Sequence, residues 1–154
     1  MLTTDFYDIL KQSPLRTHFS GVYPSDKVPS CLKVTHFIVC NIDDSSKPGS
    51  HWYIVYRPNV NTLECFDSLG FSEEKKQFLI ESFNFSAIKK LKCNITNLQP
   101  SNSQSCGKYC LYFIYNRFYN QDLSFHDLMN EIFEIDTSVN ETIVNNFYED
   151  VIKT

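Results

Sequence analysis

The stretch that decides the fold is QPSNSQSCGKYCLYFIYNRF, Gln99–Phe118, in which a polar run gives way to an apolar one. From Cys106 onward, apolar side chains occupy almost every side of a helical wheel, so the segment predicts a buried central helix. The junction also has a chemical meaning. A cysteine at a helix N-terminus has a stabilised thiolate and a lowered pKa, so Cys106 is a candidate nucleophile.

The segments around this helix supply a sheet and further helices. Apolar and β-branched runs predict strands over 34–42, 51–57 and 63–68, and alternating apolar and basic residues predict a strand from Ile88. Helical spacing and N-cap residues predict helices over 3–12, 72–83, 124–133 and 140–152, whereas 21–30 is expected to be a loop. The sequence therefore predicts one α+β domain over 1–154, with a mainly antiparallel central sheet flanked by helices.

The composition is that of a packed globule and excludes several functional classes. Hydrophobic residues make up 42% of the 154 residues, and the net charge of −4 argues against DNA as a partner. The one basic cluster, Lys89, Lys90 and Lys92, is expected to be a solvated strand face. No apolar run reaches the length of a membrane span, and the N-terminus lacks a signal-peptide pattern. We expect an intracellular monomer that is not secreted, with free thiols and no metal site.

A cysteine nucleophile needs a base and a group that orients the base. His51 opens a predicted strand directly after a turn, where its side chain reaches the rim of the sheet. A hairpin closed symmetrically about Asn59 would place His51 directly opposite Asp67, with Cβ atoms about 5 Å apart on one face. The residues therefore predict Cys106 as nucleophile, His51 as base and Asp67 as orienting acid.

The oxyanion that forms during acyl transfer needs a hydrogen-bond donor. Gln99 and Gln104 both precede Cys106 closely, and either can act with the backbone N–H of Cys106. Their positions alone do not decide which of the two glutamines is the oxyanion donor.

The motifs GSHW, FDSLGF and LQPSNSQSCGKYC, in this order, resemble the adenovirus protease (adenain) superfamily. This superfamily includes adenain-like proteases of Polinton/Maverick elements and related DNA viruses and, more distantly, the Ulp/SENP deSUMOylating peptidases. The resemblance implies the adenain/Ulp-like cysteine protease fold, with His51 as general base, Asp67 as its acid and Cys106 as nucleophile. The family's spacing from Gln through Asn-Ser to Cys-Gly favours Gln99 over Gln104 as the oxyanion donor.

The resemblance also implies a function. We expect a cysteine endopeptidase that processes viral or mobile-element proteins, such as capsid or precursor proteins, at glycine-containing sites. Removal of a SUMO-type modifier and a catalytically silent binding domain are the alternatives. The implied place of action is the host nucleus or cytoplasm, or the virion. No motif requires a cofactor. Adenain is activated by DNA and by a peptide that forms a disulfide, and Cys93 lies in the region that would receive one.

Overall fold

The computed structural model describes residues 1–43, 45–46, 51–83 and 87–153. Within these ranges one sheet has the strand order β1-β2-β3-β4-β5. The strands are β1 Phe19–Tyr23, β2 Phe37–Asn41, β3 Trp52–Asn59, β4 Thr62–Phe66 and β5 Lys90–Cys93. The two central pairings, β2–β3 and β3–β4, are antiparallel as expected. Both outer pairings are parallel, because the chain crosses over before it enters β2 and β5.

The helices confirm the sequence-based elements closely. They are α1 Thr3–Lys11, α2 Glu73–Ser82, α3 Cys106–Tyr119, α4 Phe125–Ile132 and α5 Thr137–Lys153, with short 3-10 turns η1 Pro14–Thr17 and η2 Ser25–Lys27. The N-caps explain two of the starts, because Ser72 accepts a hydrogen bond from the N–H of Lys75 and Ser124 from that of Asp127. The α+β class is therefore confirmed.

Strand β1 lies partly in the segment that was expected to be a loop. Gly21 has a φ of 124°, a conformation that favours glycine, and the register against β2 shifts between Phe19 and Val22. Such an irregular edge strand shows no alternation of apolar and polar residues, which is why the sequence pattern does not reveal it.

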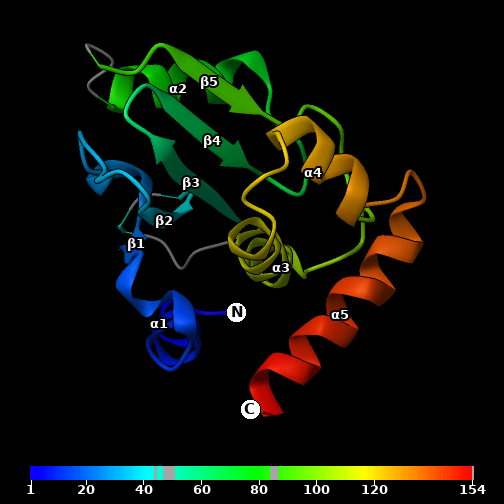
Figure 1. The fold of residues 1–154 in the computed structure, drawn as a ribbon. Helices are drawn as coiled ribbons and strands as arrows, with labels where there is room; N and C mark the ends of the chain where they lie inside the picture. The colour runs from blue at the N-terminus through cyan, green and yellow to red at the C-terminus, as the bar shows by residue number, and fades with distance from the viewer. Residues whose placement is uncertain (44, 47–50, 84–86, 154) are drawn as a thin grey trace.

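Both faces of the sheet are covered. Figure 1 shows α3 nearly end-on, between the sheet and helices α1, α4 and α5. Phe66 of β4 stacks on Phe113 of α3 with ring centroids 4.7 Å apart. On the opposite face, Val55 and Cys65 belong to a separate apolar cluster with Leu79 of α2. Because helices cover both faces, every residue of β2 and β4 is buried.

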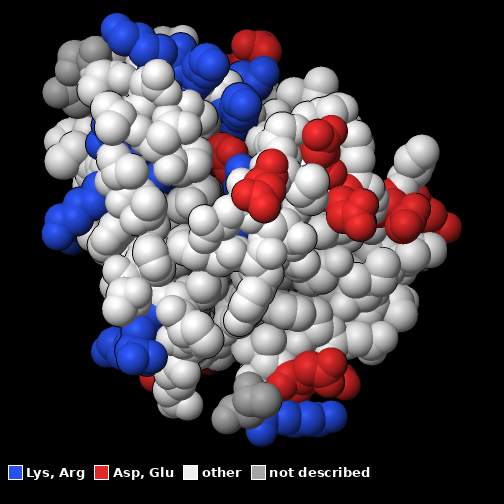
Figure 2. All heavy atoms as spheres, viewed as in Figure 1, with Lys and Arg blue, Asp and Glu red and all other residues white. Residues whose placement is uncertain are grey.

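Basic and acidic side chains each gather at one place on the surface. Lys89, Lys90 and Lys92 are all exposed, which confirms the solvated strand face. Figure 2 shows basic side chains gathered over the β5 side of the molecule and acidic ones over α4. No helix in the described part of the chain is both long and apolar enough to cross a membrane.

Candidate active site

The hairpin of β3 and β4 turns about one residue later than predicted. The ladder pairs Ile54 with Phe66 and Asn59 with Thr62, so the predicted closure about Asn59 is wrong. The physical reasons are the turn and an irregularity of the ladder, since the register shifts by one residue between Tyr56 and Asn59. Two residues form the loop, which is the commonest hairpin length, and Asn59 Oδ1 accepts a hydrogen bond from the N–H of Asn61 at 3.2 Å.

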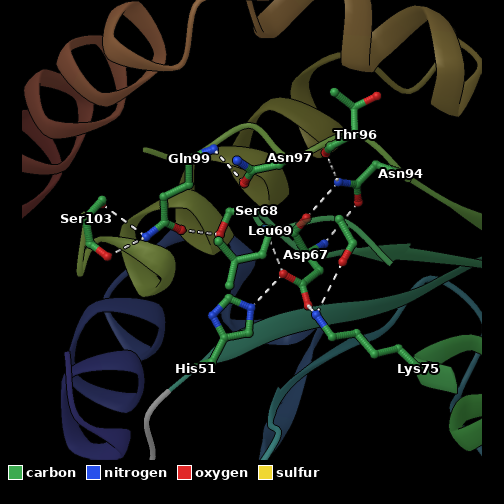
Figure 3. Close-up of polar contacts among 11 residues, drawn as sticks. His51, Asp67, Ser68, Leu69, Lys75, Asn94, Thr96, Asn97, Gln99 and Ser103 are labelled. Carbon is green, nitrogen blue, oxygen red and sulfur yellow. Dashed lines mark hydrogen bonds and ion pairs between the residues drawn. The ribbon is translucent and has the colours of Figure 1, made fainter. Parts of the chain in front are cut away.

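His51 and Asp67 nevertheless meet. His51 directly precedes β3 and Asp67 directly follows β4. If the observed register is continued by one residue, the position opposite Asp67 is Tyr53 and not His51. Because side chains alternate, an offset of two residues keeps both on the same face as diagonal neighbours. His51 Nε2 lies 2.6 Å from Asp67 Oδ1, and both side chains are buried (Figure 3).

Asp67 has further hydrogen-bond partners besides the imidazole of His51. Its Oδ1 also accepts the N–H of Leu69 at 2.8 Å, and its Oδ2 accepts the ammonium of Lys75 from α2 at 2.9 Å. Asn94, just after β5, binds the backbone N–H and carbonyl of Asp67 at 3.0 and 2.6 Å. Burial raises the pKa of Asp67, but His51, Lys75 and Leu69 outweigh it, so the net shift is downward. The carboxyl group is therefore ionised.

Cys106 is the first residue of α3 and is 7% exposed. Burial raises the pKa of its thiol, but hydrogen bonds with His51 and the N–H groups of Trp52 and Gly107 outweigh burial and lower it. For His51, burial lowers the pKa, while Asp67 and Cys106 together raise it to about 9. Asp67 occupies Nε2, which leaves Nδ1 for the thiol. The contacts favour a thiolate–imidazolium pair.

Gly107 allows the N-terminal segment to pack against the start of α3. A Cβ at this position would lie 2.9 Å from Met1 Sδ and 3.1 Å from Phe6 Cζ. The neighbouring Trp52 donates from Nε1 to the Met1 carbonyl at 3.2 Å, and its ring lies 5.0 Å from that of Phe6. Trp52 therefore belongs to the packing around the start of α3, where Cys106 lies.

The two candidate glutamines differ in their surroundings. Gln99 is 2% exposed, whereas Gln104 is exposed. Gln99 Oε1 accepts a hydrogen bond from Ser68 Oγ at 2.5 Å, and its Nε2 donates to the carbonyl and the hydroxyl of Ser103, both at 3.0 Å. This oriented amide near the start of α3 favours Gln99 over Gln104. Its role as oxyanion donor stays a prediction.

The remaining cysteines and histidines have other surroundings. Burial raises the pKa of three core thiols, those of Cys40, Cys65 and Cys110. The other three histidines bind elsewhere: His18 to Thr35, His36 to Ser20 and His126 to Asn130. No cluster of three metal-binding side chains occurs among the described residues.

Sequence reasoning missed four residues whose side chains contact the predicted site residues or the loop before Cys106: Ser68, Lys75, Asn94 and Glu141. Ser68 directly follows Asp67 in the FDSLGF motif, and this position could have indicated that its side chain lies near the site. The others come from α2, from the segment after β5 and from α5, and no local pattern connects them with the site. Only the tertiary structure brings them together.

The chain is similar to known proteases. The sequence profile of the adenovirus endoprotease family (Peptidase C5) matches residues 19–154, a region that contains all four predicted site residues. Among solved structures, the ASFV pS273R protease matches at 26% identity and a TM-score of 0.43. That match covers 72% of this chain and 42% of the other, so this chain corresponds to less than half of that relative. No curated protein matches the chain.

Proposed function

Because the chain belongs to the adenovirus endoprotease family, we propose that it is a cysteine endopeptidase with Cys106 as nucleophile, His51 as base and Asp67 as orienting acid. One observation carries the proposal. A buried imidazole lies 2.6 Å from a buried carboxylate, and it lowers the pKa of a thiol that stands at a helix N-terminus. This is the arrangement that activates a cysteine for attack on a carbonyl.

The mechanism follows from these contacts. The Cys106 thiolate attacks the scissile carbonyl, and the imidazolium of His51 gives its proton to the leaving amine as the C–N bond breaks. His51 then takes a proton from water, which attacks the acyl-enzyme and releases Cys106. Asp67 keeps the imidazole oriented in both steps. The N–H of Cys106, which has no acceptor within its helix, would stabilise the oxyanion. The amide of Gln99 would do so by turning one of its two N–H groups from Ser103 to the oxyanion.

The proposed substrates are viral or mobile-element precursor proteins with glycine at the cleavage site. The burial of the site supports this choice, because His51 and Cys106 are only 6% and 7% exposed. An extended chain reaches such a thiol most easily where its side chains are small. The proposed place of action is the host nucleus or cytoplasm, or the virion.

The test combines cleavage with covalent labelling. The protein is incubated with peptides of the Gly-Gly-Xaa type and, separately, with SUMO and ubiquitin active-site probes, and the labelled residue is mapped by mass spectrometry. We expect peptide cleavage that requires Cys106. Labelling by the SUMO probe without peptide cleavage would favour the deconjugating alternative. Neither cleavage nor labelling would favour a catalytically silent binding domain.

A further inference from the structure

One carboxylate from α5 gathers three hydroxyl groups around the start of α3. Glu141 Oε1 accepts hydrogen bonds from Ser103 Oγ and Ser105 Oγ, both at 2.8 Å. Its Oε2 accepts the hydroxyl of Tyr109 at 3.0 Å. These three residues lie just before Cys106, at the N-cap and in the first turn of α3. Glu141 therefore ties the last helix to the loop that presents Cys106.

The carboxylate also fixes the direction of a chain of hydrogen bonds. An ionised carboxylate can only accept, so the Ser103 hydroxyl donates its proton to Glu141 and offers only lone pairs to other groups. It accepts the N–H of Ser105 at 3.1 Å and Nε2 of Gln99 at 3.0 Å. The oxygen of the Gln99 amide consequently faces Ser68, whose hydroxyl donates to it (Figure 3).

The direction matters because the two ends of a glutamine amide have nearly the same shape and opposite hydrogen-bonding character. We infer that Glu141 is a positioning residue that, through Ser103, keeps the N–H groups of Gln99 on the side of the loop entering α3. The inference rests on the proposed function, since it concerns the amide that would stabilise the oxyanion. Without the carboxylate, the Ser103 hydroxyl can donate to Gln99 and the amide can turn over.

We expect Glu141→Gln to lower kcat less than the removal of the Gln99 side chain would. The carbonyl of Ser103 still accepts from Nε2 and partly retains the orientation. Removing one oxyanion donor costs about 10²–10³ in turnover, so we expect Glu141→Gln to lower kcat about tenfold. KM should stay within about twofold, because such a donor acts mainly in the transition state. Alkylation of Cys106 by iodoacetamide should not change, because the thiolate depends on His51 and the helix start.

The matched control is Glu149→Gln, which alters an exposed carboxylate on the same helix and should leave kcat unchanged. Ser103→Ala is a second variant: it cuts the link to Gln99 while Glu141 keeps its bonds to Ser105 and Tyr109. It should reproduce the loss in kcat, and it serves as the test should Glu141→Gln not fold.

A double substitution decides the route of the effect. In a Gln99→Ala background, Glu141→Gln should cost nothing further; an equal loss there would overturn the inference, because Glu141 would then act by another path. An unchanged kcat in Glu141→Gln, or an alkylation rate that falls in parallel with kcat, would also overturn it. If the unaltered protein shows no turnover dependent on Cys106, the proposed function fails and this inference fails with it. Turnover that requires Cys106 but ignores Glu141→Gln defeats the inference alone.

Discussion

Two thiols on α3 differ sharply although only one helical turn separates them. Cys106 is 7% exposed and Cys110 is 0% exposed, so burial alone would raise the pKa of both. The pKa of Cys110 does lie well above its usual value, through burial and the nearby charges of Cys106 and Asp67. The pKa of Cys106 is lowered instead, because His51 and the N–H groups of Trp52 and Gly107 stabilise its thiolate.

The difference shows that the groups around a thiol, and not burial alone, decide what a cysteine can do here. The N–H groups of the first turn have no acceptors within the helix and are free to stabilise an anion. One turn further along, each backbone N–H donates to the carbonyl four residues earlier, and Cys110 belongs to the buried apolar cluster around α3. The same side chain is therefore a proposed nucleophile at one position and a packing residue at the other.

The largest expected effect is the difference in turnover between alanine variants of the two thiols. Cys106→Ala should abolish peptide cleavage, a loss of at least about 10⁴ in turnover, because loss of the nucleophile leaves only binding and the oxyanion site. Cys110→Ala should stay within about threefold of the unaltered protein. Steady-state kinetics on a Gly-Gly-Xaa peptide measure both variants, with circular dichroism to verify folding. A folded Cys110→Ala variant without activity would mean that the wrong thiol has been assigned.

The second prediction tests whether His51 creates the difference. Asp67→Asn removes the charge that orients His51 and helps to raise its pKa, so turnover should fall at least about tenfold. The pH at which Cys106 alkylates should rise, as measured by iodoacetamide labelling between pH 5 and pH 10. Glu64→Gln is the control, since Glu64 is a buried carboxylate of β4, the strand that leads to Asp67, and pairs with Arg117 instead. Glu64→Gln should lower the free energy of unfolding and leave the pH profile of Cys106 alkylation unchanged. If both variants shift that profile, the shift comes from lower stability and not from the loss of the charge beside His51.

The pH profile gives a third test. The lowered pKa of Cys106 keeps the thiolate present below the ordinary pKa of a thiol, and a pKa of about 9 keeps His51 protonated up to that pH. Turnover should therefore fall as pH rises through about 9, where His51 can no longer protonate the leaving amine. Cys110→Ala should give the same profile. An upper limb near pH 6.5 in kcat/KM would indicate an ordinary histidine and contradict the ion pair.

Local patterns were sufficient for the features that depend on neighbouring residues. The N-caps Ser72 and Ser124, the central strands and the position of Cys106 at a helix start all follow from short-range rules. The predicted faces of His51 and Asp67 also held, because the hairpin register missed by two residues rather than one.

The features that the sequence did not reveal depend on distant segments. The parallel pairing of β5 with β4 depends on how α2 carries the chain across the sheet, which no periodicity encodes. Lys75, Asn94 and Glu141 reach the site from three separate elements, and each looks like an ordinary polar residue in its local context. Their contribution is a matter of geometry, and long-range geometry has no local signature.

The smallest expected effect concerns the second thiol alone. If Cys110 only packs, then Cys110→Ala removes a buried sulfur from the core around α3 and leaves a small cavity. The free energy of unfolding should fall by about 1 kcal/mol, the lower end of the range for large-to-small core substitutions, because only one heavy atom is lost. Cys31→Ala is the matched control, since Cys31 is exposed and its loss should change stability by less than about 0.5 kcal/mol. Urea unfolding followed by fluorescence of Trp52 measures both variants. Equal stabilities would show that Cys110 contributes no packing, and its burial one turn below Cys106 would then need another explanation.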